Sequence, residues 1–363
     1  MKLLFSRNRV LASISGAVPF ENPLSSLIPN RAFPKKKISS DRLKTLCEEL
    51  DPLTNKHSSI SSFFQDSSIV IGSKKYAENE LKRGVRGNKK NVVGLLLSFP
   101  FKCRVPIKTG YHSLPDLGEC MFIHRLGKIC TEISTKTDFK FKIIVAEETD
   151  ALAPVFGASR HDCKATRLRL NKYRDLLGYK SSVKFSSLMA LMSHSRSQYE
   201  KGLFAQAERI KANSTKHKKQ LKRVLSTIAI SLPTNNLSLK ESHQLVASFF
   251  NNSSTALEKK QLYDTSFKYL AFNELLTEKI YVSKTSRYLR LSVCPKKGRI
   301  GIRPTISKVK ILPHHGVPVV RIKNNQRKFQ IEYYFDFLLN TLNESPIEVC
   351  DEDGNFLYYE VEH

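Results

Sequence analysis

The stretch that most constrains the fold is a short apolar run that ends at a proline. Residues 92–99 are apolar except for Gly94 and Ser98, and Pro100 follows them. A continuous apolar run of this length, bounded by loop residues, is typical of a strand buried on both faces of a parallel sheet. The sequence therefore predicts an α/β domain with a central buried strand at residues 92–99.

Three cations follow this strand, and they are Lys102, Arg104 and Lys108. Ligands of open α/β sheets bind outside the carboxyl ends of the strands, so these side chains are candidates for binding an anion such as a phosphate. The alternative is that they are solvated loop charges, because the chain has 60 Lys and Arg residues.

A helix is predicted to begin at Asp116, directly after Pro115. Asp116 is the expected N-cap, and Glu119 is the reciprocal carboxylate of a capping box. Apolar residues then recur at helical spacing on one face, and they are Phe122, Leu126, Ile129, Cys130 and Ile133. The capping box accounts for both acids, so neither is assigned to catalysis.

A second buried strand is predicted at residues 141–146, and Glu147, Glu148 and Asp150 follow it. Two apolar strands separated by a helix indicate a right-handed βαβ unit. Its carboxylates and the earlier cations then share one sheet edge. These three carboxylates have two possible explanations. In the first, one of them serves as a general base or binds a substrate ammonium group. In the second, all three begin a turn and offset the charge of nearby cations.

The remaining patterns complete a Rossmann-like α/β fold, a mostly parallel sheet flanked by helices, with a smaller C-terminal β-rich part. Helices are expected at residues 41–50, 160–184 (ending near Gly178), 199–230 and 264–280. Strands are expected at 287–293 and 317–322, and hairpin turns at Asn324-Asn325 and Asp353-Gly354. Residues 74–90 are expected to form a mobile basic surface or a lid. The predicted division is an N-terminal extension with a helical, basic segment (1–90), a catalytic domain (91–325) and a C-terminal hairpin region (326–363).

Two later segments carry further candidates. Arg290 and Ser292 alternate with leucines, so both project from the same face of a strand, where a guanidinium suits a carboxylate or phosphate. His315 lies in a turn and is suited to acid/base chemistry near neutral pH. Its neighbour His314 has no partners at metal-ligand spacing, and Cys294 before Pro295 is better explained by packing than as a nucleophile.

Composition limits compartment and partners. The net charge of +27 favours polyanions or phosphorylated ligands, but the lysine-rich helices lack the aromatic residues that stack on bases, so nucleic acid is not the favoured partner. Seven cysteines without a CxxC pair indicate a reducing compartment. No apolar run reaches transmembrane length, so a cytoplasmic protein without a membrane partner is expected.

Several motifs together resemble the pyoverdine/dityrosine biosynthesis family, the isonitrile synthases. They are FPFK at 99–102 with Lys108, LPDLGE at 114–119, FKIIVAEET at 141–149, RLSVCP at 290–295 and PHHGVPV at 313–319, in the family's order over about residues 90–325. The resemblance implies an enzyme that joins the amino group of tyrosine or tryptophan to C2 of ribulose 5-phosphate. The sugar is then fragmented so that its C2 becomes an isonitrile carbon.

The resemblance also implies roles for individual residues, with no metal and no organic cofactor. Lys102 and Lys108, beside Arg104, would hold the sugar phosphate. Arg290, beside Ser292, would bind an oxyanion of either substrate. His315 would shuttle protons, and Glu148 would replace the acid of the family's Asp-Gly turn.

This chain departs from the family pattern inside the motifs. Cys103-Arg104-Val105 replaces Ser-Pro-Asn, Glu148-Thr149 replaces Asp-Gly, Cys294 replaces a histidine and His314 replaces a tryptophan. The amino-acid substrate is therefore left open. The alternative function is a catalytically diverged member of the family that binds nucleic acid or another polyanion.

Overall fold

The structure is a computed structural model of the 363-residue chain. It describes residues 31–51, 62, 65–66, 69–72, 74–87, 91–99, 112, 114–138, 140–156, 160–192, 195–221, 224, 256–281, 288–293, 299–303 and 311–362. Lys102, Arg104, Lys108 and Cys294 lie outside these residues.

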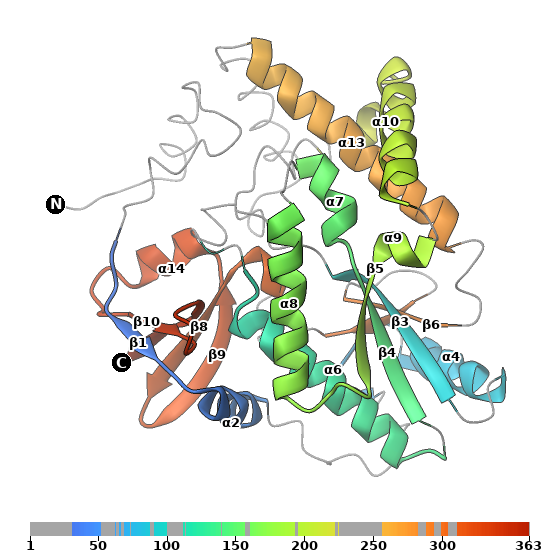
Figure 1. The fold of residues 1–363 in the computed structure, drawn as a ribbon. Helices are drawn as coiled ribbons and strands as arrows, with labels where there is room; N and C mark the ends of the chain where they lie inside the picture. The colour runs from blue at the N-terminus through green and yellow to red at the C-terminus, as the bar shows by residue number, and fades with distance from the viewer. Residues whose placement is uncertain are drawn as a thin grey trace.

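The main sheet has six strands in the order β2-β7-β6-β3-β4-β5 (Figure 1). Their bounds are β2 (Val70–Ile71), β3 (Asn91–Phe99), β4 (Lys140–Glu147), β5 (Val183–Ser187), β6 (Leu289–Ser292) and β7 (Ile300–Ile302). All neighbours are parallel except β2 and β7, which pair antiparallel. This confirms the predicted mostly parallel sheet with the run at 92–99 in its middle.

Helices contribute to two apolar cores, one on each face of the main sheet. In the first, α6 (Leu117–Thr135) and α8 (Arg160–Leu176) lie with Phe141 and Leu291 of the sheet. The second core contains Leu95 and Ala146 of the sheet. Its helices are α7 (Thr149–Phe156), α9 (Leu188–Met192), α10 (Arg196–Ala212) and α13 (Ala256–Tyr281).

The helix between β3 and β4 begins as its sequence predicts. The Asp116 side chain accepts a hydrogen bond from the Gly118 backbone N–H at 2.9 Å, and the Asp116 N–H donates to Glu119 Oε2 at 2.9 Å. Both acids are buried. The capping box is therefore present, and it fixes where the chain turns from the end of β3 into α6.

A second, mixed sheet has the order β1-β10-β11-β8-β9. Its strands are β1 (Lys35–Lys37), β8 (Val317–Lys323), β9 (Gln326–Glu332), β10 (Ile347–Cys350) and β11 (Phe356–Glu362), accompanied by α2 (Ser40–Leu50), α14 (Tyr334–Asn340) and the 3-10 turn η3 (Pro313–His315). Both predicted hairpins are confirmed: Asn324 and Asn325 have φ of 50° and 60°, and Gly354 has φ of 80°. The predicted domain limit at 325/326 falls inside the β8–β9 turn.

Two predicted helices end earlier than expected. The one at 199–230 is interrupted, because α10 ends at Ala212 with Asn213 as its C-cap and residues 213–217 form turns. The other, predicted at 160–184 with an end near Gly178, does end close to that glycine, at Leu176, because Gly178 adopts a φ of 78°, and Lys184 lies in β5. Residues 74–87 form the helix α4 (Lys74–Gly87), because Lys, Glu, Leu and Ala outweigh Gly84 within it, and the role of this segment as a mobile surface or lid stays a prediction.

Candidate functional site

The carboxyl ends of the parallel strands bring several predicted site residues to one edge of the main sheet. Glu147 at the end of β4 pairs in register with Phe99 of β3 and with Ser187 of β5. Ser292 at the end of β6 pairs with Leu97 of β3. The β3 end, from which the chain continues toward Lys102, thus lies between the predicted carboxylates and Ser292.

The predicted residues of β4 and β6 are buried to different degrees. Glu148 follows β4 and is 6% exposed, and its carbonyl oxygen accepts a hydrogen bond from the Leu152 N–H at 2.8 Å. Ser292 is 1% exposed and Arg290 is half-buried. Leu289 and Leu291 belong to the α6 core, so Arg290 and Ser292 project from the opposite face of the sheet.

The turn that holds His315 lies against the beginning of α6. A Cβ atom built on Gly118 would be 3.3 Å from Cβ of Pro313, the first residue of η3. The second sheet therefore brings this turn next to the helix that follows the cation-bearing segment. A shared pocket for His315, Glu148, Arg290 and the cations stays a prediction.

An arginine that the sequence analysis did not identify holds two of the candidate carboxylates. Arg167 of α8 donates from Nε to Glu147 Oε1 and from an Nη to Asp150 Oδ2, the latter at 2.5 Å. Residues 160–176 contain six Lys and Arg residues, and spacing alone does not distinguish which of them reaches β4. The carboxylates after β4 are therefore offset by a specific ion-pair network.

Two buried oxygen atoms at this edge have no hydrogen-bond partner in the described part of the chain. They are Glu147 Oε2 and Ser187 Oγ. Glu147 is 1% exposed, so its second oxygen is removed from water as well. No sequence signal indicated Ser187, because a serine at a strand end is ordinary until its neighbours are known.

The pKa of Glu147 gives a test of this environment. Burial raises that pKa above its ordinary value of 4.5, against the opposing effect of Arg167. The folded protein then holds the proton more tightly than the unfolded chain does. The resulting stabilisation is complete below pH 4.5 and is lost as the pH rises through the raised pKa of the folded state.

We therefore expect Glu147→Gln, which cannot ionise, to lose less stability than the wild type over this rise in pH. The difference amounts to about 1.4 kcal/mol for each unit by which the folded and unfolded pKa values differ. Urea unfolding of both proteins from about pH 4 to about pH 8 measures it. Parallel stability curves would show that Glu147 is not perturbed.

A histidine ties the segment before α6 to the second sheet. The His112 ring stacks on Phe356 with ring centroids 3.6 Å apart and an interplanar angle of 8°, and its Nε2 lies 2.9 Å from the Tyr359 hydroxyl. His112 is four residues after Lys108. The C-terminal strand β11 therefore anchors one end of the segment that carries the predicted phosphate-binding cations.

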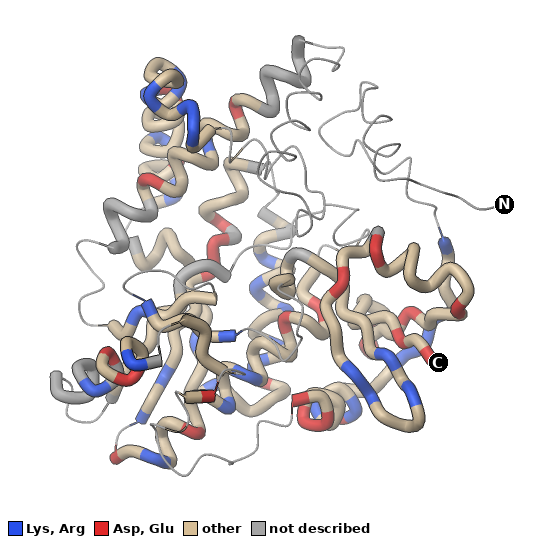
Figure 2. The backbone as a smooth tube through the Cα atoms, turned by 180° about the vertical axis from the view of Figure 1, so that it is seen from behind, with Lys and Arg blue, Asp and Glu red and all other residues tan. Residues whose placement is uncertain are grey.

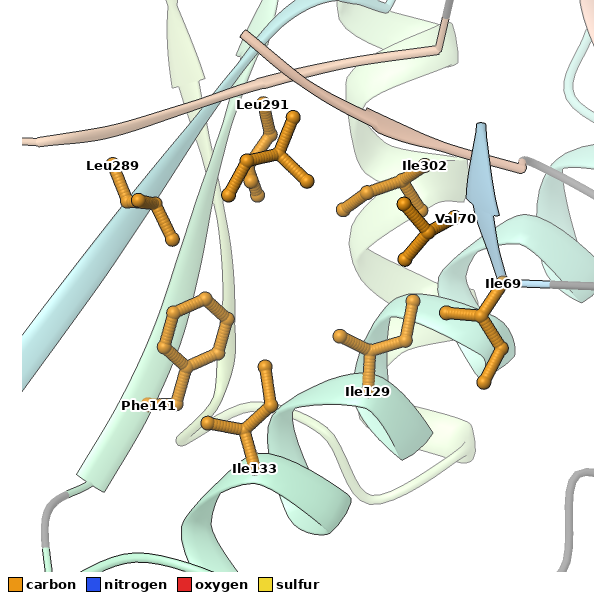
Figure 3. A pocket seen from close by; sticks show the side chains of 9 residues that line it. Ile69, Val70, Ile129, Ile133, Phe141, Leu289, Leu291 and Ile302 are labelled. Carbon is orange, nitrogen blue, oxygen red and sulfur yellow. The ribbon is translucent and has the colours of Figure 1, made fainter. Parts of the chain in front are cut away.

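A small apolar cavity between the main sheet and α6 does not belong to this site (Figure 3). Its volume is about 10 Å³, and its nine lining residues are all apolar. A space of about 10–15 Å³ holds one water at most, and that water needs polar partners. The lining residues Phe141 and Leu289 lie at the beginnings of their strands, at the opposite end from Glu147.

The described ranges contain no group of three or more His, Cys, Asp or Glu side chains placed to hold a metal ion. None of the helices there combines the length and apolarity needed to cross a bilayer.

Comparison with known proteins places the chain in a family. The model of a family described as pyoverdine/dityrosine biosynthesis protein matches residues 83–332. The crystal structure of the PvcA protein from Pseudomonas aeruginosa is similar, with a TM-score of 0.53 and 16% sequence identity over 83% of this chain and 99% of that one. No curated protein gave a match. Because the family model covers well over half of the chain, the protein belongs to the pyoverdine/dityrosine biosynthesis family.

Proposed function

We propose that the protein is an isonitrile synthase-like enzyme of natural-product biosynthesis. It joins the amino group of an amino acid, tyrosine or tryptophan, to C2 of ribulose 5-phosphate and converts the amine into an isonitrile. The observation that carries the proposal is the register of Phe99 with Glu147. This pairing places the strand end three residues before Lys102 beside the carboxylates, in a chain that belongs to a biosynthetic family.

The proposed chemistry needs a phosphate site, an oxyanion site and proton transfer. Lys102, Arg104 and Lys108 bind the sugar phosphate, because three cations within seven residues of sequence suit a dianion. Arg290 and Ser292 bind an oxyanion of either substrate. Imine formation and the later eliminations need acid/base groups, and Glu148 and His315 supply them without a metal or an organic cofactor. These roles rest on the family resemblance and on the shared sheet edge.

Product formation tests the proposal directly. The purified protein is incubated with tyrosine or tryptophan and ribulose 5-phosphate, and the mixture is analysed by mass spectrometry for the isonitrile. We expect an isonitrile from at least one amino acid. No product with any common amino acid, from protein with a cooperative unfolding transition, would contradict the proposal.

The phosphate site is tested by Lys102→Ala. Loss of one charge-assisted hydrogen bond is expected to weaken ribulose 5-phosphate binding by about 10- to 100-fold, which corresponds to roughly 1.5–3 kcal/mol. Lys142→Ala is the matched control, because Lys142 is an exposed lysine near the other end of β4. Equal affinities of the two variants, measured by calorimetry, would remove Lys102 from the site.

The charge distribution supports the polyanion-binding alternative in one place. Four cations of α8 are engaged by carboxylates: Arg167 by Glu147 and Asp150, Arg169 by Asp351, Lys172 by Asp353 and Arg174 by Asp175. Exposed cations also gather at the end of α10 and just beyond it (Figure 2): Arg209, Lys211, Lys216, Lys218 and Lys219, of which Lys211 pairs with Glu208 and Asp264. The basic helices therefore do not provide one unpaired face.

A further inference from the structure

The two oxygens without a hydrogen-bond partner in the described residues belong to neighbouring residues at the ends of β4 and β5. Glu147 and Ser187 are register partners in a parallel ladder, so their side chains leave the sheet on the same face. Glu147 Oε2 and Ser187 Oγ are both buried, and neither has a hydrogen-bond partner in the described residues. Their position is the carboxyl edge of the sheet, where ligands of open α/β folds bind.

Such a pair is costly unless something binds to it. A buried polar atom without a partner costs about 1–3 kcal/mol, and nearly all such atoms in folded proteins are satisfied. A carboxylate oxygen accepts hydrogen bonds, and a serine hydroxyl accepts and donates. The pair can therefore hold a ligand group that donates more than one hydrogen bond.

The surrounding charges select a cationic donor. Arg167 contributes one positive charge, whereas Glu147 and Asp150 contribute two negative charges when ionised. The excess of negative charge among these three ion-paired side chains favours an ammonium group, which has three donors. The Arg167 side chain is 38% exposed, whereas the Glu147 side chain that it contacts is buried. We infer that a ligand reaches Glu147 from the side on which Arg167 is exposed.

We propose that Glu147 Oε2 and Ser187 Oγ bind the ammonium group of the amino-acid substrate, and that Glu147 accepts its proton. This inference rests on the proposed function. The ammonium N–H bond breaks, its proton bonds to the Glu147 carboxylate, and the nitrogen keeps the electron pair. That pair then forms the C–N bond to C2 of ribulose 5-phosphate, while the carbonyl π pair moves to oxygen, and this oxygen takes the proton back from Glu147.

The environment of Glu147 suits this role better than that of a permanent anion. Burial raises its pKa, so the carboxylate is a stronger base than an exposed glutamate. Arg167 fixes its other oxygen and leaves Oε2 oriented for the ligand. Glu147 is thus a catalytic residue in addition to Glu148, and Ser187 is a binding residue that the family motifs did not indicate.

Binding of matched ligands tests the inference. L-tyrosine and its deaminated analogue 3-(4-hydroxyphenyl)propionate differ only in the ammonium group, and calorimetry gives the affinity of each. We expect Glu147→Gln to weaken tyrosine binding by at least about tenfold, as for loss of a charge-assisted hydrogen bond, and to leave binding of the analogue unchanged. The same measurements with L-tryptophan and indole-3-propionate cover the second candidate substrate.

Two further variants separate a ligand role from a structural one. Ser187→Ala removes a hydroxyl that has no partner among the described residues, so it is expected to keep or raise the melting temperature while it weakens binding of the amino acid. Glu132→Gln is the matched control: Glu132 of α6 is 5% exposed, and its Oε2 lies 3.6 Å from Lys136 Nζ without a hydrogen-bond partner in the described residues, but it lies away from the sheet edge. It should leave tyrosine and tryptophan affinity unchanged.

The outcomes distinguish this inference from the proposed function. Unchanged amino-acid affinity in both Glu147→Gln and Ser187→Ala overturns the inference, even if the wild type makes an isonitrile. Ammonium-dependent binding that is lost in both variants supports it, even if no isonitrile forms and the proposed function fails. A wild type that binds neither amino acid overturns both.

Discussion

Replacement of Asp51 by alanine is expected to lower the free energy of unfolding by about 3–5 kcal/mol, because it removes the carboxylate that lies against the buried Arg125 guanidinium. Arg125 Nη1 lies 3.3 Å from both Asp51 carboxylate oxygens, and each side chain is only 1% exposed. Burial lowers the pKa of Arg125, and the charge of Asp51 acts against that change. The pair joins the end of α2 to the middle of α6.

Further hydrogen bonds make the junction formed by Asp51 and Arg125 a connection between the end of α2, the middle of α6 and the residue after β7. Arg125 Nε donates to the Arg303 carbonyl oxygen at 2.9 Å, just after β7, and Lys128 Nζ donates to the Asp51 carbonyl oxygen at 2.8 Å. Removal of the Asp51 carboxylate therefore also loosens the contact of α2 with the main sheet. Urea unfolding followed by far-UV circular dichroism measures the change in free energy.

An exposed ion pair of α2 gives the control. Arg42 Nη1 donates to Glu49 Oε1 at 2.7 Å, but both side chains are 36% exposed. Glu49→Ala should therefore cost less than about 1 kcal/mol. A loss for Asp51→Ala no larger than that for Glu49→Ala would mean that the buried guanidinium finds another partner or water, and the proposed role of the junction would be wrong.

Local signals made part of the fold predictable. The apolar run at 92–99 and the Asp116 capping box each carry their signal within a few residues, and β3 and α6 were predicted correctly for that reason. The Asn324-Asn325 turn fixed the β8–β9 hairpin in the same way. The partners of distant strands were not predictable, because β1 pairs with β10 through residues 35 and 348, which share no local pattern.

The candidate site was likewise predictable only where the signal is local in the sequence. The carboxylates at 147–150 were predicted to follow a strand and to reach the ligand edge, because that depends only on the strand they end. Their partner Arg167 and their neighbour Ser187 were not predicted, because both depend on how the chain returns from α8 into β5. Six cations in α8 made any one of them an equal candidate from the sequence.

Gly127→Ala is expected to destabilise the protein by about 2 kcal/mol, although alanine is the better helix former by about 1 kcal/mol. Gly127 lies in α6, and a Cβ atom there would be 2.3–2.4 Å from three ring carbons of Tyr179. These carbons are at the base of the ring, so the whole side chain would have to move. Its hydroxyl would then lose the 3.2 Å hydrogen bond to His124 Nδ1.

Two controls accompany this test: a second helical glycine, and Gly127→Ala in a background where the Tyr179 side chain is shortened. Gly202 lies in α10, and a Cβ atom there would meet nothing within 4 Å, so Gly202→Ala should instead stabilise the protein by about 0.5–1 kcal/mol. Tyr179→Leu shortens the side chain, and Gly127→Ala made in that background should cost less than in the wild type. Opposite signs for the two glycine changes in urea unfolding would confirm that Tyr179 sets the spacing at α6. Equal stabilisation would show instead that the turn at Gly178 lets the ring withdraw, and that α6 tolerates a side chain at residue 127.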